Sequence, residues 1–229
     1  MSRQLPLGVR LRDAATFENF LPAGNERVLG ALQRSDAPSL YLWGAPGTGK
    51  SHLLQAVCHQ AAAQGRRAAF LPLAEPGLHP AMLEGMEQFD WLCLDDIDRI
   101  AGDSGWETAL FHAYNRLTAA GHQLLVAAAC SPAALGVQLP DLQSRLGWGP
   151  VFQLQPLGDT AKRQALQQRA AARGLSLDNE VAAYLMTRCP RDMASLFELL
   201  EGLDEASLAA QRRLTIPFVR EYLTRQPVS

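Results

Sequence analysis

The sequence predicts an α/β protein in which a parallel five-stranded sheet is flanked by helices and followed by a small C-terminal helical domain. Short apolar segments alternate with helix-like segments through most of the 229-residue chain, a pattern typical of parallel sheets. From Asp159 the composition shifts to alanine, leucine, glutamine and arginine, and helical segments follow one another. We therefore expect an N-terminal segment at 1–15, an α/β domain at 16–156 and a helical domain at 157–229.

The individual elements follow from hydrophobic periodicity and from turn residues. Strands are expected at Ser39–Trp43, Ala68–Leu71, Phe89–Asp96, Gln123–Ala129 and Val151–Leu154. Helices are expected from Asn25 (cap) to Gln33, at Lys50–Gln64, near Met82–Met86, at Trp106–Ala119, at Leu142–Leu146 after the cap Asp141, at Thr160–Arg173 after the cap Asp159, at Asn179–Arg188 after the cap Asp178, at Arg191–Leu203 and at Thr215–Leu223. Proline and glycine residues end several of these segments.

Composition and charge indicate a globular protein. The chain is 48% hydrophobic and has a net charge of -2, so no global basic field would draw it to nucleic acid or a membrane. We see no signal peptide and no apolar run of about 20 residues, which a membrane helix needs. The four cysteines form no CxxC pair and the five histidines form no HExxH, so we expect a cytoplasmic protein with reduced thiols and no zinc site.

One loop carries the strongest chemical signal. Gly44-Ala45-Pro46-Gly47-Thr48-Gly49-Lys50-Ser51 matches the Walker A pattern GxxxxGKS between a strand and a helix. Its glycines let the backbone wrap a phosphate, and the helix N-terminus adds partial positive charge. Lys50 is predicted to reach the β- and γ-phosphates, and Ser51 to bind Mg²⁺. The expected nucleotide-binding residues here are Gly44, Pro46, Gly47, Thr48, Gly49, Lys50, Ser51 and His52.

A second signal is the apolar segment that ends in Asp95 and Asp96, as a Walker B strand does. In an open α/β sheet the carboxyl ends of the strands bind the ligand. We therefore expect Asp95 to hold Mg²⁺ through water and Asp96 to orient a hydrolytic water. The alternative is a strand that ends in an Asx turn. Many P-loop enzymes place a polar side chain near the γ-phosphate at the end of the next core strand, but this chain has Ala129 there, followed by Cys130 and Ser131.

Two arginines and an N-terminal peptide complete the candidate residues. Arg145 lies on the short helix 142–146, where an arginine is usually only solvated, but near a subunit edge it could act as an arginine finger toward a neighbour's nucleotide. Arg191 is expected to contact the chain's own nucleotide. Gln4-Leu5-Pro6-Leu7 suits an extended peptide that docks in an apolar groove, the alternative being a frayed terminus.

These motifs together resemble the DnaA-related group of AAA+ P-loop ATPases and, within it, the Hda family of regulatory inactivators of DnaA. The segments that carry the resemblance are Phe17-Glu18-Asn19-Phe20, the Walker A loop, Leu94-Asp95-Asp96-Ile97 (Walker B), Leu142-Gln143-Ser144-Arg145-Leu146-Gly147-Trp148-Gly149 (arginine finger), Arg191-Asp192-Met193 (sensor 2), Leu214-Thr215-Ile216-Pro217-Phe218-Val219, and the peptide Gln4-Leu5-Pro6-Leu7 (sliding-clamp binding). The resemblance covers nearly the whole chain.

The resemblance implies a negative regulator of replication initiation. Gln4, Leu5 and Leu7 would bind the sliding clamp, the β subunit of DNA polymerase III, and this would place the protein at the nucleoid. The AAA+ body would hold ADP or ATP with Mg²⁺, and Arg145 would stimulate hydrolysis of the ATP bound to DnaA. Self-association as a homodimer or larger form is left open. Sequence-specific origin binding is not expected, because the chain stops at Ser229 without room for a DnaA-type helix-turn-helix domain.

Two departures from the family pattern affect these expectations. Gly8-Val9 stands where the family peptide tends to continue with Pro-Leu, which is expected to weaken clamp docking. Ala129 stands at the sensor 1 position, which is usually Asp in the group, so we expect weak or absent hydrolysis by the chain itself. The alternative function is a stand-alone AAA+ ATPase or loader that acts through its own turnover, as the intact Lys50 and Asp95 would allow.

Overall fold

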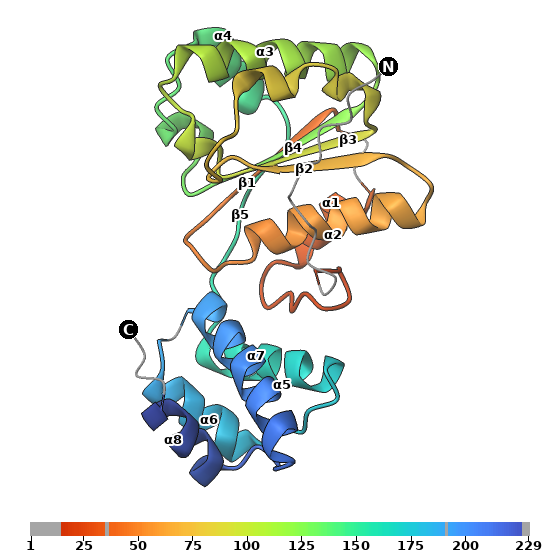
Figure 1. Ribbon diagram of the computed structural model, residues 1–229. Coiled ribbons are helices and arrows are strands. Elements are labelled where there is room, and N and C mark those ends of the chain that lie inside the picture. The colour runs from red at the N-terminus through yellow and green to blue at the C-terminus, as the bar shows by residue number, and fades with distance from the viewer. Residues whose placement is uncertain (1–14, 35–36, 191, 226–229) are drawn as a thin grey trace. The chain divides into compact units, whose positions relative to one another are not determined.

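The structure is a computed structural model that describes residues 15–34, 37–190 and 192–225 (Figure 1). The chain forms two compact units; the main segment of the first ends at Gln155, and the main segment of the second begins at Pro156. The predicted clamp-binding peptide, with Gln4, Leu5 and Leu7, lies outside the described residues, as do Gly8-Val9 and Arg191. No helix in the described part of the chain is both long and apolar enough to cross a bilayer.

A parallel five-stranded sheet forms the centre of the first unit, as the sequence predicts. Its strands, in the order β2-β3-β4-β1-β5, are β2 (Ala68–Pro72), β3 (Trp91–Asp95), β4 (Gln123–Ala128), β1 (Ser39–Trp43) and β5 (Val151–Gln153). Trp43 pairs in register with Ala128 on one side and with Gln153 on the other. Because all strands run in one direction, the carboxyl ends of β1, β3 and β4 lie at the same edge of the sheet.

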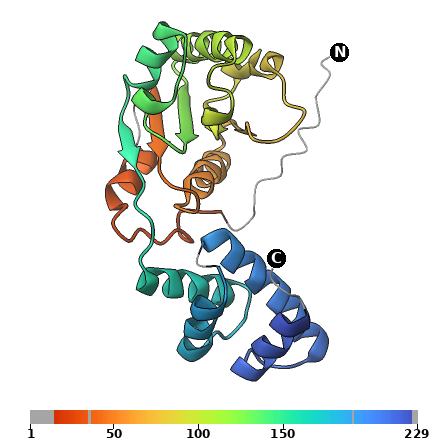
Figure 2. The ribbon, with the colours of Figure 1, turned by 90° about the vertical axis from the view of Figure 1, so that its left-hand side faces the viewer.

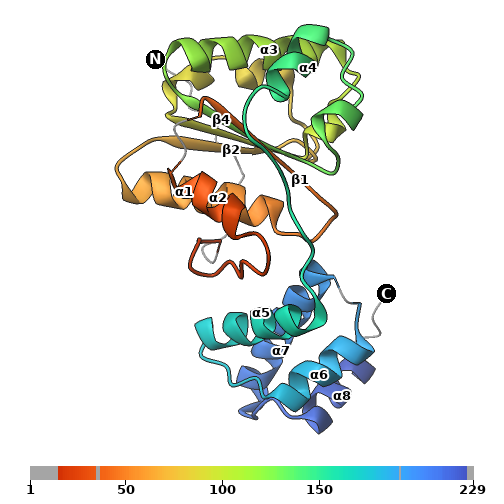
Figure 3. The ribbon, with the colours of Figure 1, turned by 180° about the vertical axis from the view of Figure 1, so that it is seen from behind.

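Helices cover both faces of this sheet. The helices are α1 (Glu26–Arg34), α2 (Lys50–Ala63), α3 (Ser104–Ala119) and α4 (Pro140–Leu146), with α1 and α2 on one face and α3 and α4 on the other (Figures 1 and 3). Alternate strand residues enter two separate cores. In β3, for example, Leu92 and Leu94 pack on the α3 side, whereas Trp91 and Cys93 pack on the α2 side. Since both faces are covered, the strands are apolar almost throughout.

The second unit is a bundle of helices with its own core (Figure 2). Its helices are α5 (Asp159–Ala172), α6 (Asn179–Arg188), α7 (Met193–Ala210) and α8 (Ile216–Arg225). Leucines from three of these helices, such as Leu166, Leu185 and Leu200, are fully buried. Arg173 joins α5 to α7 by ion pairs with Glu201 at 2.7 Å and with Asp204 at 3.3 Å.

Several helix starts differ from the sequence prediction. Helix α4 begins at Pro140 after Leu139, so Asp141 lies in its first turn and does not cap it. Asp159 likewise lies inside α5. Helix α7 begins at Met193, not at the predicted Arg191, and Asp192 caps it by accepting the Ser195 N–H at 2.9 Å. Acidic residues are favourable at both kinds of position, because they face the positive end of the helix dipole, and the sequence pattern alone does not separate the two.

Two further elements differ in extent. Helix α3 begins at Ser104, two residues before the predicted Trp106, because Asp103 caps it through the N–H groups of Gly105 and Trp106. The short helix predicted near 82–86 is instead two 3₁₀ helices, at 80–83 and 86–88. They are separated by Gly85, whose φ of 74° no regular helix contains.

Candidate nucleotide site and arginine face

The Walker A loop joins the end of β1 to the start of α2. Gly47 and Gly49 have φ angles of 77° and 94°, the left-handed region in which a side chain is strained. Gly49 is also the N-cap of α2. A Cβ added at Gly49 would lie 2.6 Å from the nearest carbon of the Phe20 ring, which is too close. Glycine is therefore required at 49 for two independent reasons. A strand that turns through such glycines into a helix N-terminus is the geometry that binds phosphate.

Lys50 lies across this loop and is only 8% exposed. Its Nζ donates hydrogen bonds to the Gly44 carbonyl at 2.8 Å and to the Ala45 carbonyl at 3.2 Å. A buried ammonium group requires such partners. A phosphate oxygen would be a stronger partner than a neutral carbonyl, because the hydrogen bond would join two charged groups. The structure thus holds the Lys50 ammonium inside the loop where the sequence places the phosphates.

Asp95 ends β3 and is 2% exposed. Burial raises the pKa of its carboxyl to about 6, an effect that a hydrogen bond with the Ser51 side chain partly opposes. The structure therefore brings together the two predicted Mg²⁺ ligands, one from the start of α2 and one from the end of β3. The described residues contain no group of three or more His, Cys, Asp or Glu that could hold a metal. Mg²⁺ held by Ser51 and Asp95 would complete its shell with phosphates and water, as is usual for this ion.

Asp96 and Ala129 lie at the ends of neighbouring strands. Asp96 has a left-handed backbone, with φ 55°, and its N–H donates to Asp95 Oδ1 at 3.1 Å. Burial, and after it the charge of Asp98, raises the pKa of the Asp96 carboxyl. Ala129 follows β4, and its N–H donates to Asp98 Oδ1 at 2.9 Å. At the position predicted to be sensor 1, the chain therefore offers a methyl group and a backbone N–H that Asp98 already engages.

His52 contacts the segment that precedes α1. Its Nε2 lies 2.7 Å from the Thr16 carbonyl oxygen, and its ring centroid lies 5.6 Å from that of Phe20. These contacts join residues 16–20 to the first turn of α2. The predicted contact of His52 with the nucleotide stays a prediction.

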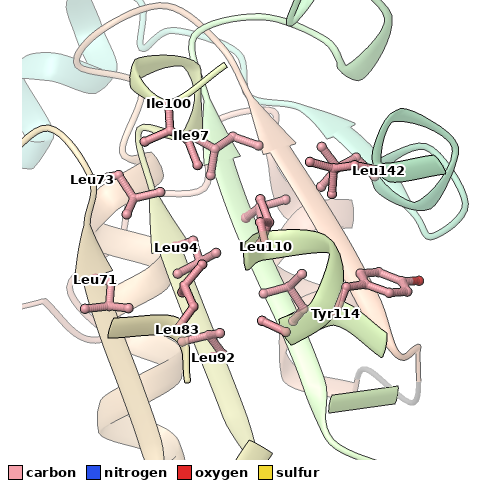
Figure 4. Packing of buried hydrophobic residues seen from close by; sticks show 14 of the residues in the cluster. Leu71, Leu73, Leu83, Leu92, Leu94, Ile97, Ile100, Leu110, Tyr114 and Leu142 are labelled. Carbon is pink, nitrogen blue, oxygen red and sulfur yellow. The ribbon is translucent and has the colours of Figure 1, made fainter. Parts of the chain in front are cut away.

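Arg145 lies on α4, away from the Walker motifs in sequence. Its guanidinium carbon is 5.7 Å from the centroid of the Tyr114 ring and 5.0 Å from that of Trp148. Tyr114 is buried in the core between α3 and the sheet, and Figure 4 shows it there together with Leu110 and Leu142. Trp148 is 73% exposed. Each cation–π contact contributes about 0.5–1 kcal/mol at such a site.

The sequence analysis missed Glu107, a carboxylate that is 2% exposed in the first turn of α3. It accepts backbone hydrogen bonds from Gly102 at 2.7 Å, Gln138 at 3.0 Å and Leu139 at 2.8 Å. Burial raises its pKa, but these hydrogen bonds outweigh burial and hold the pKa below its usual range. Because Leu139 is the N-cap of α4, Glu107 fixes the start of the helix that carries Arg145. An acidic residue in a first turn is too common to reveal such a role from sequence.

Comparisons with known proteins agree with this architecture. The family model described as "Hda, lid domain" matches residues 159–223, and that described as "Bacterial DnaA ATPAse domain" matches residues 79–153. An uncharacterized protein of Haemophilus influenzae is 44% identical over 97% of this chain and 99% of its own length. The chain belongs to the Hda-like group of DnaA-related AAA+ proteins. The predicted family is thereby confirmed.

Solved structures show the fold of this Hda-like chain in relatives. Domain III of the replication initiation protein DnaA from Thermotoga maritima has a TM-score of 0.79 at 21% identity, over 95% of this chain and 98% of that one. A replication initiator DnaA bound to AMPPCP and single-stranded DNA has a TM-score of 0.67 at 25% identity, over 88% of this chain and 70% of that one. The predicted AAA+ fold is confirmed, and a related DnaA holds an analogue of ATP.

Proposed function

We propose that this protein inhibits chromosome replication initiation by stimulating hydrolysis of the ATP bound to DnaA. The observation that carries the proposal is the contrast between Arg145, held between two rings on α4, and Ala129, which leaves the chain's own site without a sensor 1 side chain. An arginine finger offsets charge that develops on the γ-phosphate and raises the hydrolysis rate by roughly 10³–10⁵. DnaA would be left in its inactive ADP form.

The chain's own nucleotide has a different task in this proposal. Lys50, Ser51 and Asp95 hold ADP or ATP with Mg²⁺, and the contact of Arg191 with this nucleotide, expected from its sequence motif, belongs to the same proposal. The other loop residues, Gly44, Pro46, Gly47, Thr48 and Gly49, wrap the phosphates. The bound nucleotide stabilises the shape that DnaA recognises, and Asp96 orients water only to the extent that slow hydrolysis occurs. Mg²⁺ supplies charge neutralisation of the phosphates when bound.

In this proposal the N-terminal peptide brings the protein to DNA, close to DnaA. Gln4, Leu5 and Leu7 bind a sliding clamp on DNA, and this raises the effective concentration of the protein near DnaA. Such tethering increases the rate of encounter without adding contacts to the DnaA interface. Replacement of Gln4 by Ala is therefore expected to abolish stimulation at low protein concentration and to leave it intact at high concentration.

The test follows the decay of radiolabelled ATP bound to DnaA in the presence of this protein, DNA-loaded clamp and ADP, each omitted in turn. Wild-type protein with all components should accelerate the decay. Arg145→Ala should lower the stimulated rate by about 10³-fold or more. Arg145→Lys should recover little, because an ammonium group lacks the planar fork that matches phosphate. Arg66→Ala, which removes an exposed arginine from the loop between α2 and β2, is the matched control.

The outcome that contradicts the finger is normal stimulation by an Arg145→Ala protein that still binds clamp and DnaA. A second function, a stand-alone ATPase or loader, is favoured by one observation. The buried Lys50 and the Ser51–Asp95 pair form an intact nucleotide and Mg²⁺ site. Rapid turnover of free ATP by the chain alone, without stimulation of DnaA, would support this second function instead.

A further inference from the structure

Two exposed apolar side chains follow Arg145 closely in the sequence. Among the residues that the structure describes, the exposed large hydrophobic side chains are Trp148 (73%), Val151 (39%) and Leu208 (80%). Trp148 lies in the short connection between α4 and β5, Val151 is the first residue of β5, and Leu208 lies in the helical domain. β5 is a terminal strand of the sheet, because it pairs only with β1. Arg145, Trp148 and Val151, which we call the finger face, thus combine a cation with exposed apolar surface.

The backbone that carries Trp148 is held on both sides. Its own N–H donates to the Arg145 carbonyl at 3.2 Å, and the Pro150 carbonyl accepts the Tyr41 N–H at 2.9 Å. Gly149 lies against Ser39 so closely that a Cβ at 149 would overlap the Ser39 carbonyl. The indole is therefore presented by a fixed backbone. A backbone segment that is already fixed loses little conformational freedom when a partner covers it, which favours binding.

Trp148 also restricts Arg145. The guanidinium contacts the exposed indole and the buried Tyr114 ring, and no ion pair joins it to a carboxylate in the described part of the chain. Removing Trp148 would leave Arg145 with one ring instead of two. Tryptophan and arginine are the residue types that most often dominate binding energy at protein interfaces, and they do so when a partner excludes water from them.

We propose that Trp148 is the main binding residue of the finger face, that it positions Arg145, and that this face docks on the nucleotide-holding edge of an ATP-bound DnaA ATPase domain. The inference rests on the proposed function and deepens it. The positive charge of Arg145 on the finger face indicates which kind of partner binds there. The cation of the finger face lies next to apolar surface, so its complement is an apolar rim around a negatively charged triphosphate. Val151 on the terminal strand extends the contact beyond the phosphate.

The experiment uses the full-length chain with ADP and measures two quantities for each variant. The first is the dissociation constant for DnaA loaded with AMPPCP, and the second is the hydrolysis rate of DnaA-bound ATP when the variant saturates DnaA. The variants are Trp148→Ala, Trp148→Phe and Val151→Lys. Leu208→Ala removes an equally exposed side chain from the other unit and serves as the matched control.

Trp148→Ala is expected to weaken DnaA binding at least tenfold and to lower the saturated rate as well, since Arg145 then keeps only its contact with the Tyr114 ring. A loss of affinity alone would not lower the rate at saturation. Trp148→Phe should recover much of both values, because it keeps an aromatic face, and Val151→Lys should weaken binding several-fold. Leu208→Ala should match the wild type. Binding of fluorescent ADP and thermal melting show that each variant is folded.

Wild-type values for Trp148→Ala and Val151→Lys would overturn the docking face, and loss of rate in Arg145→Ala under the same conditions would leave the proposed function standing. The docking face would also be overturned if Trp148→Ala changed only the self-association of this chain. If wild-type protein bound DnaA through Trp148 but never stimulated hydrolysis, the docking face would stand and the proposed function would fail. Absence of any binding by the wild type would overturn both.

Discussion

The Walker site and the finger face place their charged groups in opposite ways. In the Walker site, Lys50 and Asp95 are almost completely buried and are held by backbone carbonyls and by Ser51. On the finger face, Arg145 is half-buried and its contacts are aromatic rings, one of which is exposed. A group that holds the chain's own ligand gains from burial, because charge–charge interactions strengthen as water is excluded. A group that acts on a partner must stay accessible.

The same comparison explains the role of Ala129. A polar side chain at the end of β4 would complete a site that hydrolyses its own nucleotide, but the chain has a methyl group there and uses Asp98 to hold the backbone. In the proposed function, the Walker site therefore retains a nucleotide, and the cation that acts in catalysis is Arg145 on the finger face. Variants that separate retention from stimulation test whether this division is real.

The largest difference between the Walker site and the finger face is expected from Lys50→Ala. Loss of a charge-assisted hydrogen bond costs about 1.5–3 kcal/mol, so affinity for the chain's own nucleotide should fall by roughly tenfold to over a hundredfold. Arg145→Ala should leave that affinity within about twofold of the wild type, because Arg145 has no part in the Walker site. Titration with fluorescent ADP measures both. Equal losses in the two variants would show that the sites are one unit.

Glu107→Ala should give the next largest effect, a loss of stability at the start of α4, the helix that carries Arg145. The substitution leaves the N–H groups of Gly102, Gln138 and Leu139 without their acceptor. An unsatisfied buried group costs about 1–3 kcal/mol, and partial access of water limits the total to roughly 3 kcal/mol. Urea unfolding measures this loss. Glu107→Gln keeps one acceptor oxygen and should lose less.

Glu107→Ala also distinguishes the two regions. Because Glu107 holds the start of α4, the substitution should lower stimulation of DnaA more than it lowers affinity for ADP. Measurements at a temperature where the variant is fully folded make this comparison fair. A fall in ADP affinity as large as the fall in stimulation would instead indicate general loss of packing.

A smaller effect is expected from Gly149→Ala, which overlaps the Ser39 carbonyl. Forced shifts of this kind cost about 1–3 kcal/mol, and for a chain of this size each kcal/mol lowers Tm by about 2–4 °C. Gly147→Ala is the matched control, because its φ is -90° and its Cβ would meet the nearest atom at 3.7 Å, an ordinary contact. A similar Tm in both variants would refute the fixed backbone beneath Trp148.

The residues of the Walker site could be predicted from the sequence because most of them lie close together in the chain. The glycines, Lys50 and Ser51 are adjacent in the chain, and a strand that ends in Asp95 needs only the topology of a parallel sheet to reach them. The contacts that hold the finger face in place could not be predicted in this way. Glu107 bonds residues about 30 positions away, and Tyr114 contacts Arg145 from a different helix. Periodicity assigns Tyr114 to the core but gives no contact partner.

The solvent exposure of individual side chains was the property hardest to predict from the sequence. Trp148 belongs to an apolar motif, and its exposure of 73% depends on the turn at Gly147 and the contact of Gly149 with Ser39. Helix termini were uncertain for a related reason. Asp141 and Asp159 favour a helix start whether they cap it or lie in its first turn, so the exact boundary depends on neighbours such as Pro140.

The smallest expected effect is the pH dependence that Glu107 contributes. Its backbone hydrogen bonds favour the ionised form more than burial and the nearby Asp103 oppose it, so its pKa is lower in the folded state than in the unfolded chain. Its stabilising contribution is therefore complete above the unfolded value of about 4.3 and is lost as the pH falls toward the folded value. The difference in free energy of unfolding between wild type and Glu107→Gln should shrink as the pH falls from 6 to 3.5. Other carboxylates titrate in both proteins and cancel in this difference. A difference that is constant with pH would show that hydrogen-bond geometry, and not ionisation of Glu107, holds the start of α4.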